Sequence, residues 1–281
     1  MAGTLYLCAT PIGNLDDMTF RVLDTLRSVD LIAAEDTRNS IKLLNRFEIK
    51  TPMTSYHEYN KVEKAEKLIA MMKEGKNIAL VTDAGTPAIS DPGEVLVAMC
   101  HENNIPVTSL PGACACITAL TLSGLPTRRF CFEAFLPTEK NERRAILVDL
   151  KEESRTIILY EAPHHLKATL AELEDALGDR RITLCRELTK KFETVMPMTL
   201  SEAVAFYKEN EPKGEYVLVV EGKSLKARKE EKQKEWQQLS IEEHMALYEG
   251  REMDRKEAMK QVAKDRGISK REVYDYLIKN C

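Results

Sequence analysis

The stretch NIALVTDAGTPAISDPG, residues 77–93, decides the fold. It opens with the apolar run 78–81, which is typical of a strand buried on both faces of a parallel sheet. Asp83 follows at the predicted end of the strand, and a loop rich in glycine and proline runs on to Asp91 and beyond. Ligands of open α/β sheets bind outside the carboxyl ends of the strands, so the loop is a candidate ligand site. An ordinary strand-to-helix connection is the alternative.

The rest of the first half repeats this alternation of strand and helix. Strands are predicted at residues 4–10, 30–35 and 105–110, with helices after each of them. Asp36 or Thr37 is placed to cap one of these helices. The pattern predicts a first α/β domain over residues 1–123 with a mostly parallel sheet.

A second α/β domain is predicted over residues 124–225, after a turn-forming stretch that reads as a hinge. Its expected strands are residues 130–136, 156–162, 181–188 and 215–222, again separated by helices. Residues 226–281 are expected to form a charged linker and a small helical domain.

Composition narrows the class of protein. Net charge is −4, hydrophobic residues make up 43%, and no apolar run reaches the ~18 residues that a membrane span requires. The N-terminus has no basic region like that of a signal peptide, and the seven scattered cysteines form no CxxC pair. We expect a cytoplasmic protein with reduced thiols and neither zinc nor another metal. Cys114 and Cys116 are expected to face different sides of one helix as packing residues.

The tail carries the basic excess of the chain. Residues 223–281 hold 15 Lys and Arg against 12 Asp and Glu. Near the C-terminus the pattern predicts a helix ended by Gly267 and another capped by Ser269 with Glu272. The outline resembles a helix-turn-helix, but a plain packing module has the same outline, so contact with nucleic acid stays open.

The loops at the strand ends suggest a cofactor without phosphates. The chain contains neither G-x-G-x-x-G nor G-x-x-x-x-G-K-[ST], so a dinucleotide site and a P-loop are both unsupported. S-adenosylmethionine needs backbone partners for its adenosine and acidic or carbonyl groups near its positive charge. Asp83, Asp91 and the turn backbones are compatible with those needs.

Several long motifs then resemble one family. The sequence is similar to the ribosomal RNA small subunit methyltransferases of the tetrapyrrole methylase superfamily. The resemblance implies two αβα domains with the cofactor cleft between them, a small C-terminal helical domain and a homodimer. It also implies S-adenosylmethionine-dependent 2′-O-methylation of a cytidine in the decoding region of 16S rRNA, within the small ribosomal subunit. Among the matching stretches are LYLCATPIGNLDDMTFR (5–21), LVTDAGTPAISDPG (80–93), CRELTKKFE (185–193) and GEYVLVVEG (214–222).

Carried over by position, the resemblance implies a cofactor site made by three loops of the first domain and two segments of the second. The implied cofactor-binding residues are Pro11, Gly13, Asp83, Ala84, Gly85, Pro87, Ile89, Ser90, Asp91, Pro111, Gly112, Ala113, Ala115, Thr118, Glu161, Ala162, Gly214, Glu215 and Tyr216.

The resemblance also gives candidates near the substrate. The general base is left open among four residues: Glu35, His57, Glu187 and Lys190. The substrate-binding candidates are Asp36, Arg38, Arg186, Lys140, Arg143 and Arg144, and the two arginines Arg38 and Arg186 suit bidentate contact with phosphate. For Arg38 the alternative is a structural pair with Asp36 or Glu35.

Two positions depart from the family pattern. Ala134 stands where we expect glycine, and Glu139 where we expect lysine, which puts a basic RNA contact from that loop in doubt. Two other functions stay open: a methyltransferase of the same fold acting on a small tetrapyrrole precursor, and a non-catalytic RNA-binding assembly factor. The helices after Leu225 favour an RNA substrate over a small molecule.

Overall fold

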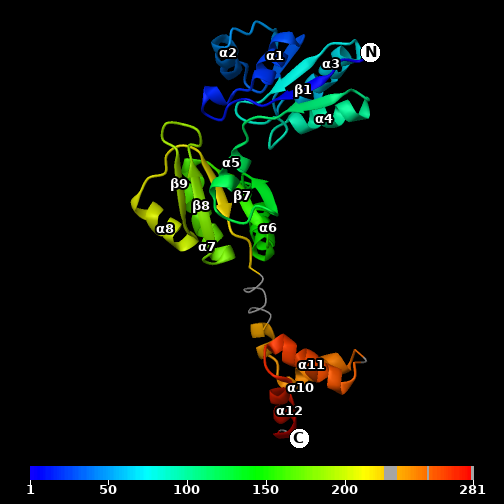
Figure 1. Cartoon of the computed structure of the whole chain (residues 1–281), viewed down its shortest axis with the longest axis vertical. Helices are drawn as coiled ribbons and strands as arrows, with labels where there is room; N and C mark the ends of the chain where they lie inside the picture. Colours follow the sequence, from blue (N-terminus) through cyan, green and yellow to red (C-terminus); the bar gives the residue numbers. More distant parts are fainter. Residues whose placement is uncertain (225–232, 252, 280–281) are drawn as a thin grey trace. The chain divides into compact units, whose positions relative to one another are not determined.

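The computed structural model describes residues 1–224, 233–251 and 253–279. By internal contacts the chain divides into two compact units, Met1–Lys151 with Arg155–Glu221, and Glu152–Ser154 with Gly222–Cys281. Both sheets lie in the first unit, and the C-terminal helices lie in the second (Figure 1). Within the described ranges, no helix combines the length and apolar character that crossing a membrane requires.

The first sheet is parallel throughout, in the strand order β3-β2-β4-β1-β5. Its central strand β4 comes from the run at 78–81, and all four residues are buried, as predicted. Helices cover both faces: buried side chains of α1 and α2 share one cluster, and those of α3 and α4 share the other. The strands are β1 (Leu5–Cys8), β2 (Leu31–Ala34), β3 (Met53–Ser55), β4 (Ile78–Val81) and β5 (Val107–Leu110). The helices are η1 (Leu15–Asp17), α1 (Phe20–Ser28), α2 (Thr37–Arg46), α3 (Lys61–Lys73), α4 (Gly93–Glu102) and α5 (Ala115–Leu122).

The second sheet is mixed, in the order β6-β7-β10-β8-β9. Only β6 and β7 run parallel, and the other neighbours are antiparallel. Strand β9 was not predicted; it contains Pro197, which an edge strand tolerates because one side of its backbone needs no partner. The strands are β6 (Phe130–Ala134), β7 (Thr156–Glu161), β8 (Arg181–Arg186), β9 (Thr194–Thr199) and β10 (Tyr216–Val220).

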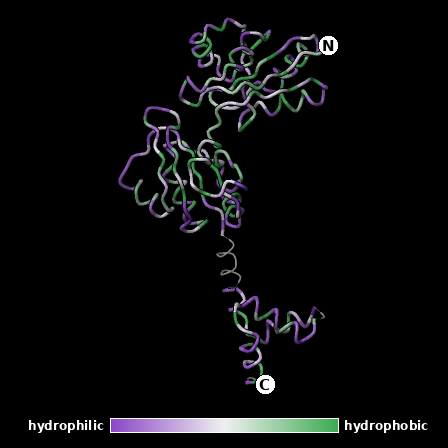
Figure 2. Tube along the Cα trace, in the orientation of Figure 1, coloured by the Kyte–Doolittle hydropathy of each residue, from purple (hydrophilic) through white to green (hydrophobic). Residues whose placement is uncertain are grey.

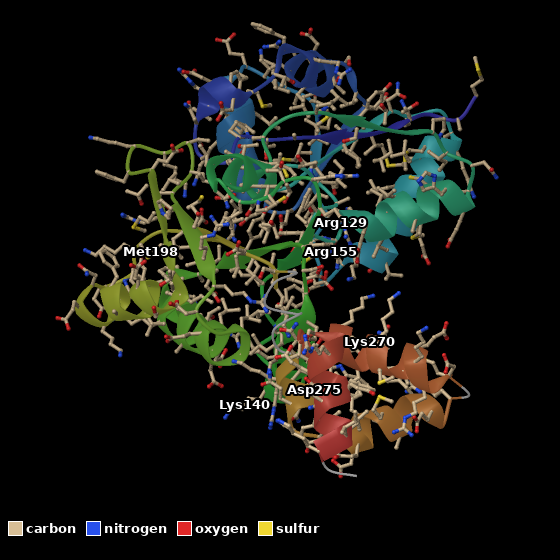
Figure 3. All side chains as sticks on the ribbon, turned by 60° about the horizontal axis from the view of Figure 1, so that its bottom comes forward. Arg129, Lys140, Arg155, Met198, Lys270 and Asp275 are labelled. Atoms are coloured by element: carbon tan, nitrogen blue, oxygen red, sulfur yellow. The ribbon has the colours of Figure 1, made fainter. Side chains whose placement is uncertain are left out.

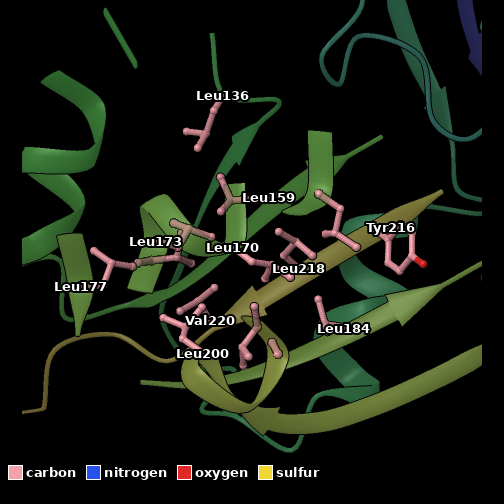
Figure 4. Packing of buried hydrophobic residues seen from close by; sticks show 14 of the residues in the cluster. Leu136, Leu159, Leu170, Leu173, Leu177, Leu184, Leu200, Tyr216, Leu218 and Val220 are labelled. Atoms are coloured by element: carbon pink, nitrogen blue, oxygen red, sulfur yellow. The ribbon is translucent and has the colours of Figure 1, made fainter. Parts of the chain in front are cut away.

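Helices from both halves of the chain cover the second sheet. Leucines of α6 (Lys140–Glu152), α7 (Pro163–Leu177) and α8 (Leu200–Glu209) pack with one face of the strands in a large buried cluster (Figure 4). The opposite face is covered by α5, which we had grouped with the first domain. Apolar residues concentrate along these strands, as Figure 2 shows. The predicted domain boundaries at residues 123 and 225 stay predictions.

The second unit contains α10 (Ile241–Glu249), α11 (Arg255–Arg266) and α12 (Lys270–Lys279) around one small core. Gly267 ends α11 with a φ of 68°, and Ser269 and Glu272 cap each other, as predicted. His244 is fully buried and stacks on Trp236, with ring centroids 4.0 Å apart. Residues 225–232 of the predicted linker lie outside the described residues.

Candidate active site

Three loops that were expected to bind a cofactor meet at the carboxyl edge of the first sheet. The Thr10 amide donates to the Gly85 carbonyl (2.9 Å), and the Gly85 amide donates back to the Thr10 carbonyl (3.1 Å). The Thr86 hydroxyl donates to the Ala113 carbonyl (3.0 Å), which ties in the third loop. These bonds fix the loops after β1, β4 and β5 against one another.

The loop after β4 is held in shape by Asp91. One carboxylate oxygen, Oδ1, accepts from the amides of Ala88 (2.9 Å) and Gly93 (2.7 Å). Ala88 and Ser90 take positive φ values of 66° and 61°, a conformation that non-glycine residues adopt only when their surroundings hold them there. Burial raises the pKa of Asp91, although the two amides oppose that shift. Asp91 therefore builds the loop.

Carboxylates gather where β2 and β4 end. Glu35 accepts from the Thr82 hydroxyl (2.6 Å) and the Asp83 amide (3.3 Å), and both bonds fall on Oε2. Asp83 in turn accepts from the Asp36 amide (3.3 Å) and from Asn39 Nδ2 (3.2 Å). Burial raises the pKa of Asp83, and the negative charges of Glu35 and Asp36 add to the rise. The edge is therefore suited to a positively charged ligand.

Asp36 caps α2 and pairs with Arg38. Its Oδ1 accepts from the Arg38 amide (2.8 Å), and the Arg38 guanidinium binds both carboxylate oxygens, at 3.1 and 2.7 Å. The Arg38 hydrogen bonds lower the pKa of Asp36 to about 2. Asp36, one of the two residues predicted for the cap, is the one that caps α2. Its pair with Arg38 is the structural alternative given for that arginine, whose side chain remains 88% exposed.

The second sheet contributes the loop that follows β8. Lys190 Nζ donates to Glu187 (2.9 Å) and to Glu215 (2.7 Å). Burial lowers the pKa of Lys190, but the bonds to Glu215 and Glu187 outweigh it and raise the pKa. The hydrogen bond from the Glu215 amide lowers the pKa of Glu187, and the bond from Lys190 lowers it further by a smaller amount. This loop touches the first domain at Gly13, where an added Cβ would lie 2.4 Å from Lys190 Cγ.

Two cavities flank the loop after β1. One, of about 340 Å³, is lined by Gly112, Ala113 and Thr118, which were implied as cofactor-binding residues, and by four further neutral residues; its charged lining residue is Asp17. The four are Ile12, Cys114, Ile117 and Thr189. The other cavity, of about 280 Å³, is lined by three predicted residues, Pro11, Gly13 and Asp83, and also by Thr10, Leu15, Asn39, Leu43 and the cations Lys42 and Arg46.

Cys114 and Cys116 differ from expectation. Cys114 is the extended residue before α5 rather than part of the helix, and this turns its thiol toward Cys116, with the sulfurs 3.4 Å apart. The two side chains therefore meet instead of facing different sides. The contact with Cys116 lowers the pKa of Cys114 to about 6.

Other predicted residues lie deeper or make structural contacts. Glu161 is buried and binds the hydroxyl of Thr169, and the Tyr216 ring lies in the core of the second domain. His57 lines neither cavity, and its buried Nδ1 has no hydrogen-bond partner among the described residues. Ala162 precedes the first residue of α7.

The basic residues predicted to bind substrate differ in their contacts and exposure. Arg143 is half-buried and is bound to Glu172 (2.5 Å) and the Thr169 hydroxyl (2.7 Å). Arg186 Nε donates to the Lys213 carbonyl (2.7 Å). Lys140, labelled in Figure 3, and Arg144 are both exposed on α6.

Comparison with known proteins assigns this architecture to a class. The model of the family Tetrapyrrole (Corrin/Porphyrin) Methylases matches residues 4–204. A solved structure of diphthine synthase has a TM-score of 0.61 at 16% identity, covering 79% of this chain and 91% of that one, which shows a shared fold. The chain belongs to the tetrapyrrole methylase family.

Closer relatives share a single name. The chain is 50% identical over 273 residues to Ribosomal RNA small subunit methyltransferase I of Halalkalibacterium halodurans, covering 97% of this chain and 94% of the relative. It is also 50% identical to the Bacillus subtilis protein of that name, over 97% and 93% of the two chains. Within the methylases, the chain groups with these small-subunit methyltransferases.

Proposed function

We propose that the protein transfers a methyl group from S-adenosylmethionine to the ribose 2′-hydroxyl of a cytidine in the decoding region of 16S rRNA. Near-full-length identity of 50% to relatives named as small-subunit rRNA methyltransferases carries this proposal. The interlocked loops after β1, β4 and β5 support it, because they form a preorganised site at the sheet edge where ligands of α/β folds bind.

The larger cavity fits the cofactor. S-adenosylmethionine has no phosphate and a positively charged sulfonium, and this cavity offers backbone groups at Gly112 and Ala113 and apolar walls at Ile12 and Ile117. Its charged lining residue, Asp17, is an anion, which suits the positive charge of the sulfonium. When bound, the cofactor supplies an electrophilic methyl group.

The smaller cavity fits a stretch of RNA backbone. Lys42 and Arg46 line it from α2 and outnumber its one carboxylate, Asp83, and cationic side chains of this kind are the usual partners of phosphate. Arg38 is exposed on the same helix, and it would contact phosphate in exchange for its pair with Asp36. The exposed Lys140 and Arg144 and the half-buried Arg186 are further candidates for phosphate contact.

The four candidate bases have different surroundings. Lys190 and Glu187 neutralise each other, and we therefore assign them to holding the loop in place. Glu35 is the preferred proton acceptor, because both of its bonds among the described residues fall on Oε2 and leave Oε1 to accept a proton. His57 remains a second candidate.

The test is methyl incorporation from labelled S-adenosylmethionine into small subunits isolated from cells that lack the protein, followed by nucleoside analysis. Labelled 2′-O-methylcytidine is the expected product. If the cofactor binds but nothing is incorporated, a small-molecule acceptor becomes the better proposal. If neither occurs, a non-catalytic RNA-binding role replaces the enzyme. We also propose that the active form is a homodimer, which sedimentation would test.

A further inference from the structure

The turn between β8 and β9 carries a large apolar side chain in a polar setting. Phe192 is 65% exposed, and its neighbours Lys191 and Glu193 are also exposed. Lys191 Nζ lies 5.7 Å from the centre of the Phe192 ring. An exposed phenylalanine alone needs no explanation, but this one stands three positions after Thr189, which lines the larger cavity.

The loop that presents Phe192 is held in a fixed shape. The Glu187 amide donates to the Glu215 carbonyl (2.9 Å), the Lys190 amide to the Glu187 carbonyl (3.0 Å) and the Glu193 amide to the Lys190 carbonyl (3.1 Å). Glu187 and Thr189 both adopt positive φ, at 51° and 65°, and such conformations persist where surrounding contacts impose them. An aromatic ring on a fixed support loses little freedom when it binds a flat partner.

The same loop borders the proposed cofactor cavity. Thr189 lines that cavity together with Gly112 and Thr118. Lys190 packs closely against Gly13 of the loop after β1. Phe192 lies three positions after Thr189 in the chain, so the loop that presents the ring also lines the cavity.

We propose that the ring of Phe192 is a platform on which an unpaired base of the RNA substrate stacks, next to the nucleotide that is methylated, while Lys191 contacts its phosphate. This inference rests on the proposed function. Proteins recognise single-stranded RNA by stacking its splayed bases on aromatic side chains beside cationic ones. Another protein surface would more often bury such a ring in an apolar patch, whereas its immediate neighbours here are charged.

The test compares Phe192→Ala and Phe192→Trp with Phe206→Ala. Phe206 is a matched control, because it is 42% exposed on α8, a helix that packs on the second sheet. Binding of unmethylated small subunits is expected to weaken about ten-fold or more in Phe192→Ala and to be kept in Phe192→Trp and Phe206→Ala. Affinity for S-adenosylmethionine, measured by calorimetry, should be the same in all of them. Lys191→Ala should lower the slope of log affinity against log salt by about one.

Several results would overturn the proposal. One is wild-type subunit affinity in Phe192→Ala, and another is an equal loss in Phe206→Ala. A change in sedimentation of Phe192→Ala, with subunit binding unaltered, would assign the ring to an interface between copies of the chain. If the wild-type protein does not methylate subunits, that result overturns the proposed function. The binding measurements on the variants then still decide whether Phe192 contacts the RNA.

Discussion

Replacing Gly112 by alanine should weaken cofactor binding through a steric effect. The new Cβ would lie 2.6 Å from the Ala9 Cβ, whereas carbon atoms pack best at ~3.5–4.0 Å, so one loop must move by about 1 Å. Ala9 is buried and precedes Thr10, whose bonds to Gly85 hold the loop after β4. Overpacking of this kind costs about 1–3 kcal/mol. If the displaced loop is the one that binds the cofactor, the dissociation constant should rise about ten-fold or more.

Calorimetric titration with S-adenosylmethionine measures this change, and thermal unfolding measures the cost in stability. A loss of 1 kcal/mol lowers Tm by roughly 2–4 °C in a unit of this size. Gly178→Ala is the matched control: Gly178 has a φ of 76°, and nothing lies within 4 Å of an added Cβ. Its ψ of −173° puts it in a region that only glycine adopts readily, so the variant should lose about 1–3 kcal/mol to backbone strain without a change in cofactor affinity. Wild-type affinity in Gly112→Ala would refute the assignment of this loop to the cofactor site.

Three further predictions test other parts of the site. Arg38→Ala and Arg186→Ala should lose methylation while they keep cofactor affinity in calorimetry, and unchanged turnover in both would remove them from the site. Alkylation of Cys114 by iodoacetamide, followed by mass spectrometry, should rise with pH through a midpoint below that of an ordinary thiol, because the contact with Cys116 lowers the pKa of Cys114. Cys116→Ala should move that midpoint upward, and bound cofactor should slow the reaction. Ala134→Gly should raise the free energy of unfolding by up to about 1 kcal/mol in denaturant titration, since Ala134 has a φ of 51°; a loss of stability would contradict this reasoning.

Local patterns predicted the first sheet well. The apolar run of β4 and the cap at Asp36 are properties of neighbouring residues, and the structure confirms both. The directions of the second sheet depend on every strand being found. Pro197 argues against a strand in the segment that forms β9. Without that strand, the sequence from β8 through α8 to β10 has the strand–helix–strand pattern of a parallel crossover. In the structure the hairpin of β8 and β9 reverses the chain first, and β10 returns antiparallel to β8.

The sequence predicted the loops of the candidate site but not all of the side chains that line its cavities. Gly112 and Gly85 were found because turn residues after strands are local signals. Thr189 reaches the larger cavity from a different sheet, and Lys42 reaches the smaller one from a helix. Neither residue has a sequence signal of its own, since only tertiary packing brings it to the site. The approach of the Cys114 thiol to Cys116 likewise depends on α5 beginning at Ala115, which leaves Cys114 outside the helix.

The strand order of the first sheet also determines when its strands can pair during synthesis. Strand β1 is apolar and leaves the ribosome before its neighbours β4 and β5, and the Thr4 amide finds its partner Asn77 only 73 positions later. At ~5–20 residues per second of synthesis, β1 is without a pairing strand for roughly 4–15 s. Closure of the first sheet, and with it the candidate cofactor site, is therefore an event late in the synthesis of this half of the chain. Throughout that interval, an unpaired apolar strand must be kept from pairing with other nascent chains.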